Sequence, residues 1–174
     1  RRVTQRAQAI APFLRFPERP YPVVEGGRIV WILEGFTGSL AYPLSADQDF
    51  GTVRRRVSYI RNSVKVTVDA VTGDINFYRV PIEDPLADAY AEAYPGLMQD
   101  MSAMPARLRA HLRYPRSLMD LQSRVLLQYH QETAATFHGQ QDVWGAPQEL
   151  SSTANPVPYV PEYGIYRLPG EESA

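Results

Sequence analysis

The sequence predicts an α+β fold in which N-terminal antiparallel β-hairpins form a sheet that packs against a C-terminal set of short helices. In Val64–Asp69, valines alternate with polar residues, which is the period of a half-buried strand. A second β-prone run, Asp74–Val80, follows a short turn in which Gly73 can adopt a positive φ. Strands come first along the chain and helices second, and that order favours an antiparallel sheet over a doubly wound βαβ fold.

The N-terminal elements follow from apolar spacing and from the placement of proline and glycine. Residues Thr4–Leu14 carry apolar side chains at helical spacing, and the Pro-rich segment 16–22 then ends this helix. An apolar strand is predicted over Arg28–Glu34, paired through a Gly-Gly turn with Val23 and Val24. Residues 37–52 are rich in Gly, Ser, Pro and Asp and are predicted to form a loop.

The C-terminal elements are predicted to be short helices. The first of these helices is capped by Asp84, has Pro85 as its first residue and ends at Pro95-Gly96. Two further helices are expected over Met104–Leu112 and Arg116–His130, and a fourth is capped by Thr133 and ends near Gly139. We expect the helix at 116–130 to cover the alternating valines with its apolar stripe, which consists of Leu118, Leu121, Val125 and Leu126.

Length and composition suggest one α+β domain over residues 1–150, followed by an extended Pro-rich tail over 151–174. No apolar run approaches the roughly 20 residues of a spanning helix, so we expect a soluble piece, with any membrane attachment outside it. The net charge of −1 argues against a nucleic-acid partner, and the lack of cysteine excludes disulfides and thiolate metal sites.

No sequence motif for catalysis or for a cofactor stands out, and no cofactor is expected. The glycines lack the spacing of a phosphate-binding loop, and no Gly-x-Ser-x-Gly elbow is present. A metal site would require the histidines to converge with a carboxylate such as Glu132 or Asp142. The alternative is that His111, His130 and His138 cap helix ends or bond backbone carbonyls, and we therefore predict no metal.

The strongest local charge feature is an arginine-rich segment. On one helix, Arg109, Arg113 and Arg116 would share a face at i, i+4 and i+7, with Leu108 and Leu112 buried behind them. This basic patch is our candidate binding site, and it suits an anionic lipid headgroup or polymer. The alternative is a solvated face whose arginines pair with acids such as Glu92, Asp100 or Asp120.

Acids and tyrosines leave two more alternatives open. Two convergent carboxylates would support glycosidase chemistry, whereas scattered ones only solvate the surface or cap helices. The candidates near predicted loops are Glu34, Asp47, Asp49, Asp69 and Asp84. The 11 tyrosines suit either packing against prolines or a platform for a peptide or glycan.

Several separated segments resemble uncharacterised protein family 0182, a group of large bacterial multi-pass membrane proteins with no established activity. The most distinctive of them is Met104–Pro115, and the resemblance covers about Arg2–Pro147. The other matching segments are Tyr21–Val24, Gly27–Ile32, Val57–Val80, Asp84–Leu86, Ala93–Leu97, Tyr129-His130, Phe137-His138 and Asp142–Trp144. The chain departs from the family at Glu34–Gly38, where members often carry an Asp-Ala-Tyr-Thr-like run. Arg167–Glu171 resembles the start of a further family segment, so we expect the tail to be the start of a further segment of a longer protein.

The resemblance implies a soluble domain attached to a bundle of spanning helices in the cell membrane, on its extracytoplasmic side. We therefore expect a non-enzymatic binding or scaffolding module. Its partner would be an anionic envelope component or another membrane protein. The alternative is an envelope hydrolase that acts on a glycan or a lipid-linked substrate, which would need two acids, or a histidine and an acid, in one cleft.

Overall fold

The computed structural model describes residues 2–51, 55–139, 144–149, 157–158, 163–164 and 169–170. The chain divides into two compact units, Arg1–Leu121 and Gln122–Ala174, and each is described by itself. The predicted boundary between a domain and a tail at residue 150 lies outside the described residues. The predicted α+β class is confirmed, with the large sheet and α1–α3 in the first unit.

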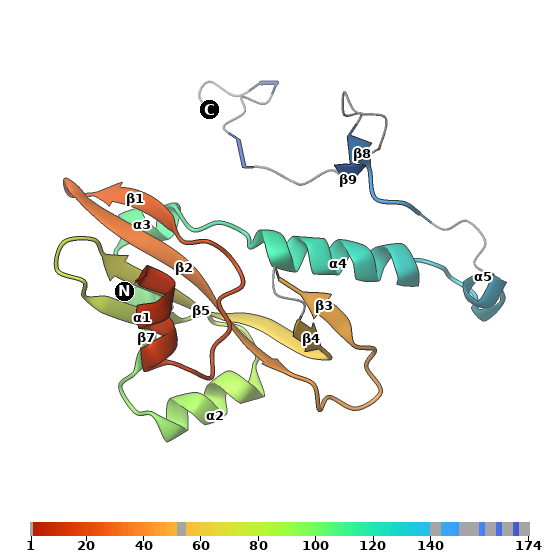
Figure 1. Ribbon diagram of the computed structural model, residues 1–174, viewed down its shortest axis with the longest axis horizontal. Helices are drawn as coiled ribbons and strands as arrows, with labels where there is room; N and C mark the ends of the chain where they lie inside the picture. The colour runs from red at the N-terminus through yellow and green to blue at the C-terminus, as the bar shows by residue number, and fades with distance from the viewer. Residues whose placement is uncertain are drawn as a thin grey trace. The chain divides into compact units, whose positions relative to one another are not determined.

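A five-stranded sheet in the order β1-β2-β5-β6-β7 forms the centre of the first unit (Figure 1). The first four strands pair antiparallel, whereas the last is parallel to its neighbour and makes the sheet mixed. The predicted hairpin is confirmed, with Val68 opposite Ile75. The strands are β1 (Tyr21–Glu25), β2 (Arg28–Ser39), β5 (Tyr59–Asp69), β6 (Ile75–Arg79) and β7 (Met98–Asp100).

Strand β2 is longer than predicted and passes through a β-bulge between Gly35 and Thr37 before it ends at Ser39. The predicted loop over 37–52 therefore contains the end of β2 and the short strand β3 (Gln48–Phe50), which pairs with β4 (Arg55–Val57). Glycine has low β-propensity, which hides the strand from a pattern search. Its role at Gly35 is close approach, because a Cβ there would lie 3.1 Å from the carbonyl oxygen of Val64.

One face of the sheet is apolar and packs on helix α1 (Val3–Ile10) and the residues after it. Val64, Val66 and Val68 are buried, as predicted, against a cluster that includes Ala7, Ala11, Leu14, Leu33 and Phe77. The expectation that the helix at 116–130 covers these valines is wrong, since the cover comes from the other end of the chain. Ala7 and Ala11 have no exposed surface, and such small side chains let α1 approach the sheet closely.

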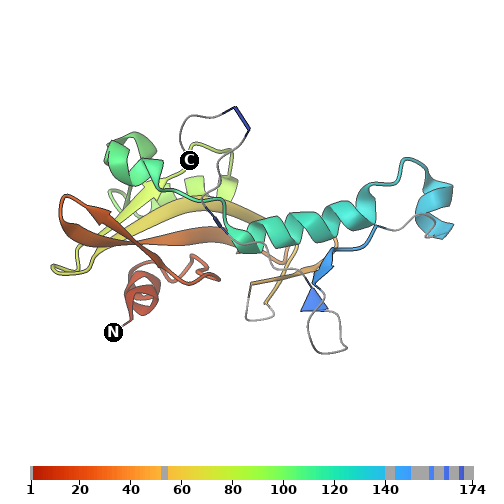
Figure 2. The same ribbon diagram turned by 90° about the horizontal axis from the view of Figure 1, so that it is seen from above.

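The opposite face receives a C-terminal helix, as the fold prediction required. Val23, Ile32 and Tyr78 pack against Met104, which follows the 3-10 turn η1 (Met101–Ala103), and against Leu108 of α3 (Ala106–Ala110). Figure 2 shows α1 and α3 on opposite sides of the sheet. Leu108 is buried as predicted, and Leu112 is partly buried beside it.

The remaining helices begin near their predicted caps. Helix α2 (Pro85–Ala93) starts where the Asp84 carboxylate accepts a hydrogen bond from the Leu86 N–H at 3.1 Å. In the second unit, α5 (Ala134–Gly139) starts where Thr133 Oγ1 accepts from the Thr136 N–H. Helix α4 (Arg116–Tyr129) precedes it, and β8 (Gln148–Glu149) pairs with β9 (Val157–Pro158). None of the helices described is long and apolar enough to span a membrane.

Candidate functional site

The arginine-rich segment is exposed but does not form one helical face. Arg109 lies in α3, which ends at Ala110, whereas Arg113 lies in the connection and Arg116 begins α4. The i, i+4, i+7 spacing requires a continuous helix, and the chain breaks it here. The Arg113 guanidinium lies 4.5 Å from the centre of the Tyr21 ring, a cation–π distance. Binding at these three arginines stays a hypothesis.

Asp84 lies at the centre of a buried polar network. Its side chain has no exposed surface, and its carboxylate accepts hydrogen bonds from Thr37 Oγ1 at 2.5 Å, from Tyr59 Oη at 2.8 Å and from Ser63 Oγ. Thr37 follows the β-bulge of β2, while Tyr59 and Ser63 come from β5. The network therefore ties the start of α2 to two central strands.

Burial alone would raise the pKa of Asp84, but hydrogen bonds from the Ser63, Thr37 and Tyr59 hydroxyls outweigh it and lower that pKa. The Tyr59 phenol changes in the other direction, because burial and its bond to Asp84 raise its pKa to about 12. Both groups therefore keep their charge states around neutral pH, and the carboxylate lone pairs are engaged by internal donors. This arrangement suits a structural anchor better than a catalytic acid or base.

A second buried carboxylate, Glu34, is paired with Lys65 directly across β2 and β5. Both side chains are buried, and Lys65 Nζ bonds Glu34 Oε2. Burial raises the pKa of Glu34, while the charge and hydrogen bond of Lys65 act against that rise. Lys65 is the only lysine in the sequence, and its ammonium meets the Glu34 carboxylate as a point charge rather than as a bidentate fork.

Two of the remaining candidate acids, Asp47 and Asp69, belong to separate ion pairs. Asp47 pairs with Arg56 at 2.9 Å, and Asp69 pairs with Arg28 at 2.9 Å. Hydrogen bonds from the Thr72 and Val71 N–H groups lower the pKa of Asp69 and identify it as a turn residue. Glycosidase chemistry needs two carboxylates across one cleft, and these interactions do not provide that pair.

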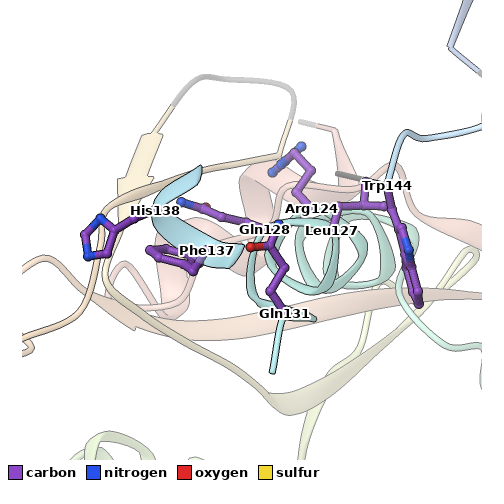
Figure 3. A pocket seen from close by; sticks show the side chains of 7 residues that line it. All are labelled: Arg124, Leu127, Gln128, Gln131, Phe137, His138 and Trp144. Carbon is purple, nitrogen blue, oxygen red and sulfur yellow. The ribbon is translucent and has the colours of Figure 1, made fainter. Parts of the chain in front are cut away.

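A cavity of about 510 Å³ lies in the second unit, between α4 and α5 (Figure 3). Its wall combines three apolar side chains with two amides and two basic side chains. These residues are Arg124, Leu127, Gln128, Gln131, Phe137, His138 and Trp144. The residues named here include no carboxylate, so the polar part of the wall is made of amides and cationic or titratable nitrogen groups.

Ring stacking orders the aromatic part of this pocket. The His130 ring stacks on Trp144 with centroids 4.1 Å apart, and Tyr129 stacks on Phe137 at 5.5 Å. His130 Nδ1 also lies 2.9 Å from the carbonyl oxygen of Leu127, which agrees with the predicted role of bonding a helix-end carbonyl. In the described parts of the chain, no group of three or more His, Asp or Glu side chains could hold a metal ion. Asp142 lies outside those parts.

The sequence predictions missed the pocket, although three of its residues, Phe137, His138 and Trp144, lie in segments that resemble the family. His138 was weighed as a metal ligand, and Trp144 closes the last matching segment. The available signal was the spacing of aromatic residues Tyr129, Phe137 and Trp144 around short helices. Chemically, the wall suits a ligand with one apolar face and an anionic or hydroxyl-rich edge, because rings and nitrogen donors lie side by side.

Comparison with known proteins gives a consistent result along the whole chain. A family model described as uncharacterised protein family UPF0182 matches residues 1–174. A UPF0182 protein of Desulfitobacterium hafniense is 38% identical over 172 residues, which cover 99% of this chain and 17% of that protein. A UPF0182 protein of Methanospirillum hungatei is 39% identical over 173 residues, covering 99% of this chain and 19% of that protein.

A third relative, from Moorella thermoacetica, is 39% identical over 174 residues, with 100% of this chain and 18% of that protein covered. The chain thus spans less than a fifth of the length of these curated relatives. No solved structure matches it. Because the family model matches the full length of this chain, the chain belongs to the uncharacterised protein family UPF0182.

Proposed function

We propose that this chain is a non-catalytic binding or scaffolding module of a larger multi-pass membrane protein, on the extracytoplasmic side. The length of the relatives supports its being part of a larger protein. The membrane attachment and its side rest on the family resemblance. The two buried carboxylates support a non-catalytic role, because Glu34 and Asp84 are engaged by internal partners.

The pocket between α4 and α5 is the observation that carries the binding function. Phe137 and Trp144 offer ring faces, and Arg124 and His138 add positive or titratable groups at the same wall. We propose an anionic envelope component as the ligand, and an acidic saccharide fits best. Its C–H face would pack on a ring, while its carboxylate would accept hydrogen bonds from the Arg124 guanidinium.

Tryptophan fluorescence tests this ligand class. The chain has two tryptophans, so Trp31→Phe leaves Trp144 as the reporter. In that background, an oligogalacturonate should change the Trp144 emission in a saturable way, and a neutral maltooligosaccharide of equal length should not. Arg124→Gln should weaken the response, and Arg113→Gln is the matched control at an exposed arginine outside the pocket.

Two results would contradict the proposed site. Equal responses to the acidic and the neutral saccharide would show that the negative charge of the ligand does not contribute to binding. A loss with Arg113→Gln but not with Arg124→Gln would move binding from the pocket to the arginine-rich segment.

The location is tested separately in the full-length protein. A reporter that works only on the extracytoplasmic side should be active when it is fused just after Pro147. A reporter active in the cytoplasm at this position would overturn the proposed side of the membrane, without bearing on what the pocket binds.

A further inference from the structure

The loop between β2 and β3 can be followed in Figure 1. Several of its apolar side chains are exposed. We name residues 40–44, Leu-Ala-Tyr-Pro-Leu, the apolar tip. Leu40 is 58% exposed, Tyr42 is 55% exposed and Leu44 is 109% exposed, so Leu44 is at least as open as in an extended peptide. Single exposed apolar residues are ordinary, but three within five residues at one turn indicate an interaction surface.

Leu44 also has an unfavourable backbone conformation. Its φ is +58°, and it is the one non-glycine residue with positive φ among the residues described. Glycine or asparagine would adopt this conformation at lower cost, and the Leu44 side chain is not buried by any of the described residues. A strained, fully exposed apolar residue points to a contact made outside this chain.

The base of the apolar tip is held in place by serine hydroxyls. Ser39 Oγ accepts from the Ala41 N–H at 2.9 Å, and Ser58 Oγ accepts from the Tyr42 N–H at 3.2 Å. Ser45 Oγ donates to the Ser58 carbonyl at 2.9 Å. Pro43 has no N–H, so none of residues 41–43 presents an unbonded backbone donor. That property matters where water is scarce, because an unbonded N–H in an apolar medium is costly.

We infer that the apolar tip inserts into the interfacial region of a lipid bilayer. The inference deepens the proposed function and rests on its placement of this region beside a membrane. A convex tip with a fully exposed leucine suits lipid, which adapts its shape, whereas a protein partner would need a matching cavity. Tyrosine is favoured at the level of the headgroups, and Tyr42 stacks on Tyr59 at 5.5 Å near the base of the tip.

Arginines near the same turn provide complementary charge for lipid phosphates. The Arg61 guanidinium lies 5.1 Å from the centre of the Tyr59 ring, and Arg56 is mostly exposed while it pairs with Asp47. The apolar contact is the main contribution, and these arginines add a preference for anionic lipid. We therefore expect the tip to bind neutral bilayers, and we expect anionic lipid to strengthen that binding.

Vesicle co-sedimentation of the 174-residue chain tests the inference. The probes are vesicles of phosphatidylcholine alone and of phosphatidylcholine mixed with phosphatidylglycerol. Replacing Leu40, Tyr42 and Leu44 by serine should weaken partitioning at least about tenfold on both. The control is Val24→Ser in β1 with Val71→Ser in the turn after β5, two valines that are 71% and 81% exposed, which should leave partitioning unchanged. Thermal unfolding followed by circular dichroism checks that each variant is folded.

A site-specific label provides a second readout. The chain has no cysteine, so Leu44→Cys allows one environment-sensitive fluorophore to be attached. Its emission should shift to the blue with vesicles and be quenched by brominated lipid. A label that stays in water, or equal partitioning by the serine variant and the parent, would overturn the inference. These results do not depend on the reporter fusion, so a failure of the proposed side of the membrane would be seen separately.

Discussion

Two buried carboxylates, Glu34 in β2 and Asp84 at the N-cap of α2, are stabilised in different ways. Glu34 faces one ammonium, Lys65, whereas Asp84 accepts from three hydroxyls and from the N–H of Leu86 at the start of α2. Both are buried, yet the pKa of Glu34 is raised and that of Asp84 is lowered. Burial alone therefore does not determine the direction of the pKa change.

The difference reflects the free energy needed to bury each type of partner beside a carboxylate. An ion pair requires two charges to leave water, and their attraction has to offset both desolvation terms. Hydroxyl and N–H donors stabilise a single charge and are themselves cheaper to bury. Asp84 has several such donors, so its charged form is favoured. Glu34 depends mainly on Lys65, with a smaller contribution from Asn62, which makes it the more vulnerable of the two.

The largest effect is expected when that main partner is removed. Lys65→Met leaves Glu34 buried without its counter-ion and should lower the free energy of unfolding by about 3–5 kcal/mol. The double variant Glu34→Leu with Lys65→Met should recover most of this loss, because no buried charge remains. Urea unfolding measures both. A double variant no more stable than the single one would show that the pair itself stabilises the sheet.

Removing the second carboxylate should have a somewhat smaller effect. Asp84→Ala leaves the Thr37, Ser63 and Tyr59 hydroxyls without their acceptor and removes the cap of α2, at a cost of about 2–4 kcal/mol. Asp88→Ala is the matched control in the same helix. Its side chain is 66% exposed and pairs with Arg79, so its removal should cost no more than about 0.5 kcal/mol. Similar losses in the two variants would mean that the network contributes little.

A single donor to Asp84 is expected to contribute less again. Tyr59→Phe should lower the free energy of unfolding by about 1–2 kcal/mol, since it removes one hydrogen bond to a charged group. Because the pKa of Tyr59 is raised from 10.0 to about 12, its contribution should be complete below pH 10 and decline as the pH rises toward 12. Ultraviolet titration should show one late-titrating phenol that is absent in the variant, and its persistence would contradict the assignment.

The smallest effect, and the most direct comparison, is the slope of stability against pH in acid. The contribution of Asp84, with its lowered pKa, is present at neutral pH and lost as the pH falls through the folded-state pKa. The contribution of Glu34, with its raised pKa, is greatest in acid and lost as the pH rises through the folded-state pKa. Each slope is limited to about 1.4 kcal/mol per pH unit.

Asp84→Asn should therefore flatten the loss of stability in acid, and Glu34→Gln should steepen it. Urea unfolding at a series of pH values measures the two slopes against that of the parent chain. Slopes that change in the same direction would show that the two carboxylates are not distinguished by their surroundings.

Local patterns were enough to predict part of the fold and little of the site. The Val64–Asp69 hairpin and the Asp84-Pro85 helix start depend on residues close in sequence, and both are confirmed. The exposure of Arg109, Arg113 and Arg116 was predicted as well. Their common helical face was not formed, because α3 ends at Ala110. The pocket could not be predicted, since it requires α5 and Trp144 to return to α4.

By itself, the sequence determined the hairpin, the helix caps and which valines are buried, since alternation and capping act within a few residues. Only the tertiary structure decided that α1 covers those valines and that Asp84 meets Thr37, 47 residues away. It also decided that Lys65 lies opposite Glu34. These choices depend on strand register, which a bulge between Gly35 and Thr37 shifts, and on which small side chains allow close packing.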